Sequence, residues 1–172
     1  NRNFDYFIIV VEQLDNKEFN RGKLLNVGFK EAKKKRCDYV VFHDVDMLAE
    51  KVDYSFSEIP MHLASDNLPF DHYFGGITLF PIDYFEKING FSNVYWGWGF
   101  EDNALNQRVL ANRDLNIDRS TFFNIGDPKI VQSFDTTTRR ISLANKKNFI
   151  NDNRNDGLST ISNLHYTINY TT

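Results

Sequence analysis

Two aspartates, Asp44 and Asp46, flank one valine directly after residues 38–43, an apolar run typical of a buried strand. Side chains alternate along an extended backbone, so the two carboxylates are expected on the same side. Two close negative charges need a compensating cation, or one of them must take up a proton. A hard divalent ion that also carries diphosphate oxygens would meet this need. A solvated turn with an aspartate capping the next element is the alternative, and the residues alone leave both open.

A second candidate site is the tryptophan loop (residues 95–100, YWGWGF), which leads into Glu101 and Asp102. Aromatic faces stack on the apolar faces of sugar rings, and glycines allow a close backbone approach. The two acids can bind acceptor hydroxyls, and one can take the proton from an attacking hydroxyl. A loop that anchors the core is the competing interpretation, with both acids in a first helical turn, where the helix dipole favours them.

Two weaker candidates are a glycine pair and a helix start. Gly75 and Gly76 follow Tyr73 and Phe74 in an apparent strand, which indicates a bulge, a close approach to a ligand, or a plain bend. Arg21 stands at a predicted helix N-terminus, where it can contact phosphate. The alternative there is a solvated arginine beside a capping asparagine.

The elements that must position these residues begin with residues 6–11 (YFIIVV), predicted as a buried strand. A helix is predicted to begin after Asn20, with Leu25 and Phe29 on its apolar face, and to end near the basic run 33–36. With the strand 38–43 this order predicts a parallel strand–helix–strand unit. Further strands are predicted at residues 61–65, 73–80, 117–125 and 164–170, and helices at 82–88, after the tryptophan loop, and at 139–149.

Composition limits the class of protein. The chain has 172 residues, 41% hydrophobic and 25% charged, as expected for one globular domain over residues 1–172. A net charge of -3 argues against nucleic acid as a partner. The sequence has no apolar stretch long enough for a membrane segment. The single cysteine, Cys37, excludes an internal disulfide and is expected to be a small buried filler. The abrupt start at Asn1 suggests a piece of a longer protein.

Taken together, the motifs resemble the β-1,4-galactosyltransferase family in order and spacing. The matching stretches are FNRGKLLNVGF (19–29), FHDVDML (42–48), YFGGITLF (73–80), NGFSNVYWGWGFEDNALNQRV (89–109) and NDGLSTI (155–161). The HDVD form and the residues Asp53, Tyr54 and Phe56 are most similar to the branch that galactosylates xylose in proteoglycan linkers.

The resemblance implies an α/β fold of the GT-A type, Rossmann-like, with a mixed sheet flanked by helices. It also implies an inverting transferase that uses Mn²⁺ (or Mg²⁺), a UDP-sugar donor and a saccharide or glycoconjugate acceptor. The implied roles are Asp46 as metal ligand, Asp44 and Val45 at the nucleotide, Phe19 and Arg21 at the uridine side, Tyr73 and Gly76 at the donor sugar, Trp98 between donor and acceptor, Glu101 on acceptor hydroxyls, and Asp102 as general base. A bulky Tyr73 is similar to the members that use galactose.

Three departures from the family pattern stand out. The strand with a Pro-Phe-Arg motif is absent, so the sheet is expected to lack this first strand. Phe100 and Asn103 replace usual residues of the acidic motif, which leaves acceptor choice open. Gln132 aligns with the metal-binding histidine, and its amide oxygen is a weaker ligand.

These departures motivate an alternative: a catalytically degenerate module that binds a UDP-sugar or carbohydrate. A phosphohydrolase that uses the aspartate pair is a weaker interpretation, because it leaves the tryptophan loop without a role. The expected compartment is the Golgi lumen for an animal-type member and the cytoplasm for a bacterial or viral one.

Overall fold

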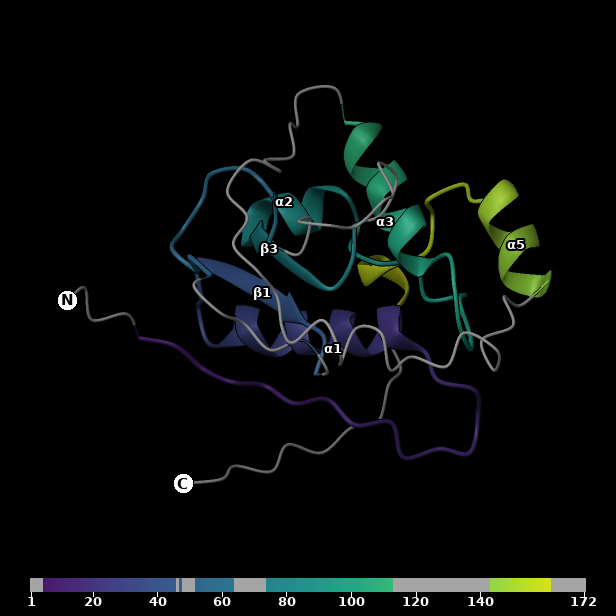
Figure 1. Ribbon diagram of the computed structural model, residues 1–172, viewed down its shortest axis with the longest axis horizontal. Coiled ribbons are helices and arrows are strands. Elements are labelled where there is room, and N and C mark those ends of the chain that lie inside the picture. Colours follow the sequence, from purple (N-terminus) through teal and green to yellow (C-terminus); the bar gives the residue numbers. More distant parts are fainter. Residues whose placement is uncertain (1–4, 46, 48–51, 64–73, 113–142, 162–172) are drawn as a thin grey trace.

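The computed structural model of the chain describes residues 5–45, 47, 52–63, 74–112 and 143–161. Figure 1 shows α1 running beside β1, with α5 at the right-hand edge of the view. The elements in chain order are α1 (Arg21–Lys34), β1 (Tyr39–His43), β2 (Met61–His62), β3 (Ile77–Pro81), α2 (Ile82–Lys87), α3 (Glu101–Leu110), α5 (Leu143–Ile150) and the 3-10 turn η1 (Leu158–Thr160).

The described strands form one sheet in the order β1-β3-β2, and both pairs are antiparallel. His43 lies opposite Ile77, so the carboxyl end of β1 meets the amino end of β3. The backbone N–H of Asp44 continues this pairing and donates to the carbonyl of Gly76 at 3.0 Å. The sheet register therefore brings Asp44 beside Gly76, the second of the paired glycines.

Aromatic rings dominate the core on one face of the sheet. The ring of Phe85 on α2 lies 4.7 Å from both Phe29 on α1 and Phe42 on β1. Leu105 and Val109 of α3 are fully buried in the same cluster, as the helical spacing predicts. Replacing one such buried phenylalanine by alanine typically costs about 3–5 kcal/mol. This shared core fixes α1, α2 and α3 relative to the sheet and to the site that they carry.

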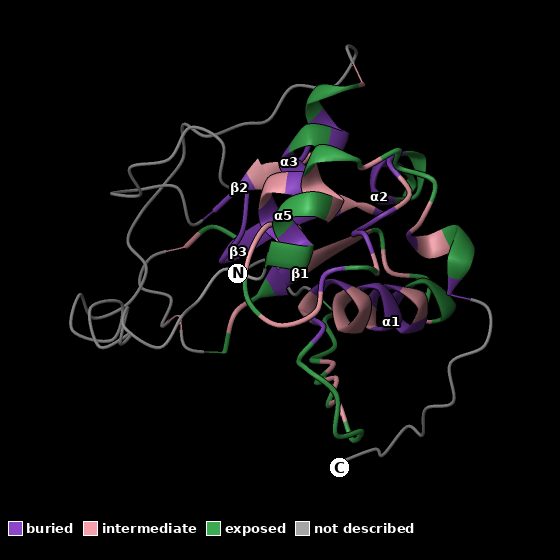
Figure 2. Ribbon diagram, turned by 90° about the vertical axis from the view of Figure 1, so that its right-hand side faces the viewer, coloured by how far each residue is buried: buried purple, intermediate pink, exposed green. Residues whose placement is uncertain are grey.

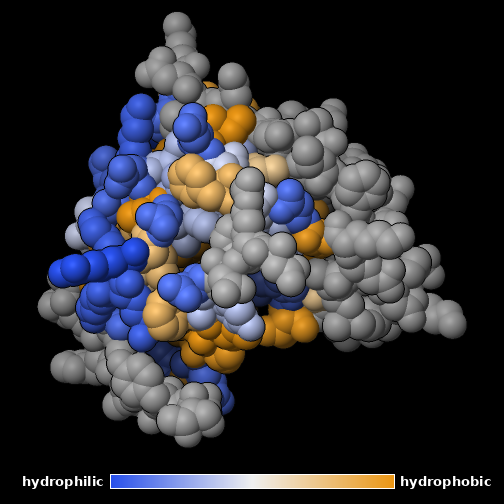
Figure 3. Space-filling view, turned by 90° about the vertical axis from the view of Figure 1, so that its left-hand side faces the viewer, coloured by the Kyte–Doolittle hydropathy of each residue, from blue (hydrophilic) through white to orange (hydrophobic). Residues whose placement is uncertain are grey.

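Buried residues gather in the strands and on the inward side of α1, whereas α5 has one buried residue, Asn145 (Figure 2). The described atoms on the face in Figure 3 mix hydrophilic and hydrophobic residues, without one broad apolar area among them. Among the described residues, no helix is long and apolar enough to cross a membrane.

Helix starts follow the expected local signals. The Asn20 side chain caps α1 by accepting from the N–H of Lys23 at 3.0 Å. Pro81 precedes the first residue of α2, which ends one residue earlier than predicted. The predicted helix after the tryptophan loop is α3, and α5 matches the carboxyl-terminal part of the helix predicted at 139–149. The predicted strands 61–65 and 73–80 shorten to β2 and β3, partly because some of their residues lie outside the described ranges.

The strand predicted at residues 6–11 was wrong. This segment has no regular structure, and Tyr6, Ile8 and Val10 are 77%, 82% and 81% exposed. In Figure 1 it passes along α1 as the purple trace. An apolar run forms a strand only where a neighbour satisfies its backbone groups, and within the described residues no strand pairs with it.

The prediction of a parallel strand–helix–strand unit was also wrong. Its first strand is missing at residues 6–11, and β1 pairs antiparallel with β3 instead. The parallel part of the expected mixed sheet is therefore not seen in the described ranges. Cys37 is partly exposed rather than buried. The strands predicted at 117–125 and 164–170 lie outside the described residues.

Candidate active site

One arginine, Arg21, joins two acidic residues that are far apart in the sequence. Its Nη2 lies 2.6 Å and its Nε 2.8 Å from Oδ1 of Asp44, and its Nη1 lies 2.7 Å from Oδ1 of Asp102. Arg21 opens α1, Asp44 follows β1, and Asp102 lies in the first turn of α3. We call these three residues the acid cluster. It unites the first residue of the Asp-Val-Asp stretch with the predicted general base.

Gly75 leaves the space that the Asp102 carboxylate occupies. A Cβ atom built on Gly75 would lie 2.1 Å from Oδ2 of Asp102, so any side chain there would displace the acid. The buried ring of His62 supports this stretch, since its Nε2 donates to the carbonyl of Gly75 at 2.9 Å. A glycine at position 75 therefore allows another group to lie against the backbone, and that group is the Asp102 carboxylate of the protein itself.

The acid cluster sets the charge state of Asp102. Burial raises the pKa of Asp102 to about 7, although the guanidinium of Arg21 acts in the opposite direction. The nearby carboxylates of Glu101 and Asp44 raise it further. Burial lowers the pKa of Arg21, but Asp102 and Asp44 together outweigh this and raise it, so the arginine stays charged. The guanidinium of Arg21 thus pairs with two carboxylates, and the more buried of them, Asp102, can hold a proton near neutral pH.

The tryptophan loop has one buried and one half-exposed aromatic residue. Tyr95 is buried and anchors the loop, whereas Trp98 is 47% exposed. The ring of Trp96 lies 5.5 Å from the ammonium groups of both Lys17 and Lys23. The loop packs on the segment before α1, because the N–H of Gly97 donates to the carbonyl of Phe19 at 2.8 Å. This contact brings the loop next to Arg21.

The other residues predicted for the site are placed as follows. Phe19 and Val45 are 56% and 96% exposed; Val45 directly follows Asp44 in the chain, and Phe19 lies two residues before Arg21. Gly76 has a positive φ of 73° and accepts the Asp44 N–H. Tyr73, Asp46 and Gln132 lie outside the described residues, so the predicted metal ligands are not placed. Within the described ranges, no three histidine, cysteine or acidic side chains gather as a metal site.

The sequence analysis did not predict a buried polar cluster that contacts the turn before the tryptophan loop. Arg108 of α3 is 1% exposed and donates to the carbonyl of Gly90 at 3.1 Å and to Oδ1 of Asp156, also at 3.1 Å. Asp156 in turn accepts from Ser92 Oγ at 2.8 Å and from the backbone N–H of Asn93. The NDGLSTI stretch therefore fixes the turn before the tryptophan loop. A buried arginine within a helix is not visible from periodicity alone.

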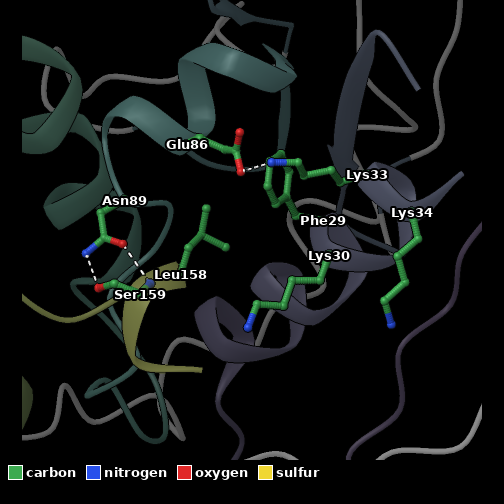
Figure 4. A pocket seen from close by; sticks show the side chains of 8 residues that line it. All are labelled: Phe29, Lys30, Lys33, Lys34, Glu86, Asn89, Leu158 and Ser159. Atoms are coloured by element: carbon green, nitrogen blue, oxygen red, sulfur yellow. Dashed lines mark hydrogen bonds and ion pairs between the residues drawn. The ribbon is translucent and has the colours of Figure 1, made fainter. Parts of the chain in front are cut away.

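A cavity of about 630 Å³ opens elsewhere on the molecule, between α1, α2 and η1 (Figure 4). Its cations are already paired, since Lys33 contacts Glu86 and Lys30 donates to the carbonyl of Ile161 at 2.6 Å. The predicted catalytic and binding residues are not part of its lining. The predicted residues Arg21, Asp44 and Asp102 lie in the acid cluster and not at this cavity.

Comparison with known proteins identifies the same family that the motifs resemble. A sequence profile described as the N-terminal region of glycosyl transferase group 7 matches residues 1–57. A second, described as the N-terminal domain of galactosyltransferase, matches residues 60–132. Human beta-1,4-galactosyltransferase 4 is 46% identical over 118 residues, which cover 63% of this chain and 34% of that protein. Xylosylprotein 4-beta-galactosyltransferase of Caenorhabditis elegans is 33% identical over 98% of this chain and 62% of its own length.

Solved structures give the same result. The catalytic domain of Drosophila β1,4-galactosyltransferase 7, in complex with xylobiose, superposes with a TM-score of 0.71 at 30% identity, over 91% of this chain and 69% of that one. A mutant of the same fly enzyme, in complex with manganese, UDP-Gal and xylobiose, gives 0.69 at 29% identity, over 86% and 66%. These likenesses confirm the expected GT-A fold. The chain spans about a third of the length of the human relative.

Proposed function

Because this chain belongs to the β-1,4-galactosyltransferase family, we propose that it transfers galactose from UDP-galactose to a saccharide hydroxyl, with inversion and a β-1,4 linkage. The acid cluster is the observation that carries this proposal. Arg21 links Asp44, expected at the nucleotide, to Asp102, expected at the acceptor hydroxyl. A transferase needs these two functions side by side, because the hydroxyl must attack the sugar while the diphosphate leaves.

A xylose-containing acceptor has the best support. The fly relative is solved with xylobiose, and the nematode relative that matches 98% of this chain is named for a xylosylprotein acceptor. These statements concern those proteins, and we extend them to this chain as the first acceptor to test.

A divalent cation fits the residues that are available. The predicted ligands, Asp46 and Gln132, offer carboxylate and amide oxygens, which hard ions such as Mn²⁺ and Mg²⁺ accept. The fly relative is solved with manganese and UDP-Gal. Asp44, two residues before Asp46, is held by Arg21 and by the Gly76 carbonyl, which fixes the end of β1. When bound, the ion would neutralise the diphosphate leaving group.

The chain's own residues supply the proton transfer and the orientation. Asp102, with a pKa of about 7, is ionised in part of the molecules at neutral pH and can accept the proton of the attacking hydroxyl. Arg21 keeps the Asp102 carboxylate in one orientation through Oδ1. The exposed ring of Trp98, four residues before Asp102, offers a stacking surface for a sugar.

The relatives reported above come from human, nematode and fly. An animal-type compartment therefore has more support than a bacterial or viral one. We place the activity in the Golgi lumen as part of this proposal.

The test is a transfer assay with UDP-galactose, MnCl₂ and a panel of monosaccharide acceptors that includes xylose, with UDP release and product mass as readouts. Asp102→Asn should lower transfer by roughly a hundredfold or more, because it removes the base. Asp83→Asn is the matched control: it also changes an acid in a first helical turn, but Asp83 is exposed on α2.

Normal transfer by Asp102→Asn would overturn the role of Asp102. Binding of UDP that is insensitive to EDTA, with no transfer by the parent chain to any acceptor, would favour the degenerate binding module instead.

A further inference from the structure

Asn145 is a buried polar residue for which the proposed reaction has no role so far. It lies on α5, has 1% of its surface exposed, and is the buried residue of that helix. Its Oδ1 accepts from the N–H of Trp96 at 3.3 Å. Its Nδ2 faces three carbonyls, those of Trp96 at 3.0 Å, Gly99 at 3.1 Å and Trp98 at 3.5 Å. One side chain thus contacts the backbone of the tryptophan loop at three residues.

The backbone of the loop explains why such a partner is needed. Gly97, Gly99 and Phe100 all have positive φ angles, of 71°, 107° and 75°. A chain that turns this way has no helix or strand ladder for its carbonyls, which must find other donors. The Asn145 amide supplies these donors from a segment 46 to 49 positions away.

Two neighbours on α5 reinforce the same contact. The ring of Phe149 stacks on Phe100 with centroids 5.0 Å apart and planes 29° apart. Asn148 Nδ2 donates to the carbonyl of Val94 at 3.2 Å. The helix therefore meets the loop at both ends, and Asn145 binds its centre. Arg21 and Asp44 are held instead by each other and by the β1–β3 pairing, independently of α5.

We propose that Asn145 is a positioning residue for acceptor binding, which rests on the function proposed above. It fixes the tryptophan loop so that Trp98 stands at a defined place relative to Asp102. Loss of its hydrogen bonds frees the loop backbone and misplaces Trp98, while the acid cluster and the nucleotide side keep their structure. The acceptor, not the UDP moiety, is then the ligand whose binding suffers.

The chain offers a direct probe of this loop, because its two tryptophans, Trp96 and Trp98, both lie there. Tryptophan emission and its quenching by acrylamide therefore report on the loop without any substrate. Asn145→Asp keeps the size and one acceptor oxygen but places a carboxylate against three carbonyls. Asn145→Ala removes all the hydrogen bonds. Lys146→Ala is the matched control, an exposed neighbour on the same helix.

Both Asn145 variants should increase acrylamide quenching and raise the acceptor KM roughly tenfold or more, since small misplacements of binding groups are costly. The Kd for UDP with MnCl₂, measured by calorimetry, should stay within about twofold because the nucleotide side is unchanged. Lys146→Ala should match the parent in all three measurements. If Asn145→Ala does not fold, Asn145→Ser, which keeps one hydroxyl donor, should fold and show an intermediate effect.

Unchanged quenching and unchanged acceptor KM in folded Asn145 variants would overturn the positioning role. Equal losses in acceptor and UDP binding would also overturn it, because they indicate a general structural defect. The quenching measurement needs no turnover. A parent chain without transferase activity would therefore refute the proposed function, while the fluorescence would still decide whether Asn145 holds the loop.

Discussion

The general-base role proposed for Asp102 rests on the surroundings of its carboxylate. Oδ1 is paired with Arg21, and Oδ2 lies where a Cβ atom on Gly75 would stand, so the carboxylate is buried. Burial and the neighbouring carboxylates raise its pKa towards the pH at which a base is most useful. Its folded pKa lies above the unfolded value, so ionisation of Asp102 reduces stability as the pH rises from about 4 to 7. Such a cost is typical of a functional site rather than a structural one.

Glu101 raises the pKa of Asp102, the proposed general base, and a charge-removing substitution should show this effect. In the parent, kcat should fall about tenfold per pH unit below pH 7, as Asp102 takes up its proton. Glu101→Gln removes a negative charge that raises the pKa of Asp102, so this acid limb should move to lower pH. The measurement is a pH profile of kcat at saturating acceptor.

Glu86→Gln provides the control, because Glu86 lies on α2 and pairs with Lys33 away from the acid cluster. An acid limb that stays in place, or moves to higher pH, in Glu101→Gln would show that the titrating group is not Asp102.

At the scale of elements, the site depends on how loops are held between helices. The side chain of Asn26 on α1 holds the turn before the tryptophan loop. It donates to the carbonyl of Phe91 at 2.8 Å and accepts from the N–H of Phe91 at 3.0 Å. The segment before η1 holds the same turn from the other side through Asp156. Elements distant in sequence thus clamp one short stretch, and α3 begins soon after it.

Gly157 tests this clamp. A Cβ atom there would lie 2.0 Å from the carbonyl oxygen of Asn89, and the residue has a φ of 144°. Gly157→Ala should therefore destabilise the protein by about 3 kcal/mol, since both the backbone conformation and the Leu158–Asn89 hydrogen bond suffer. Chemical denaturation of the variant would measure this loss.

Gly28→Ala is the comparison, because the only described atoms that its Cβ would meet are those of the Val11 side chain at 3.3 Å, and it lies within a helix, where alanine is favoured. It should change stability by about 1 kcal/mol or less. If Gly157→Ala is as stable as Gly28→Ala, the contact of residues 157 and 158 with the Asn89 carbonyl does not support the fold.

At the scale of the whole molecule, the site is assembled from segments that span most of the described chain. It draws on the start of α1, the end of β1, the start of β3, the tryptophan loop with α3, and α5. Ligand binding should therefore stabilise the entire fold, because only the folded chain brings these segments together.

UDP with MnCl₂ at about a hundred times its Kd should add about 2.7 kcal/mol to stability. For a chain of this length, that raises Tm by roughly 5–10 °C. EDTA should remove most of this increase in Tm, because the proposed metal ion binds the diphosphate oxygens. Asp46→Ala, which removes a predicted metal ligand, should do the same. A rise in Tm with UDP that EDTA and Asp46→Ala leave intact would contradict the metal prediction and support a degenerate binding module.

The sequence alone determined the features that neighbouring residues encode. The Asn20 cap, Pro81 before α2, and the spacing of Leu105 and Val109 predicted helices, because capping and periodicity are local. The order of the motifs indicated the family. It also singled out Arg21, Asp44 and Asp102, although it did not indicate that one guanidinium would join them.

Only the tertiary structure decided which groups meet. Three contacts join residues that are separated by dozens of positions: the Arg21–Asp102 ion pair, the Asp102 carboxylate against Gly75, and the hydrogen bonds of Asn145 to the tryptophan loop. Such contacts leave no local pattern in the sequence. The failed strand at residues 6–11 has the same origin: apolar, β-branched residues favour a strand, but a strand exists only when its backbone has a partner. The pKa of Asp102 likewise follows from burial, which the fold as a whole creates.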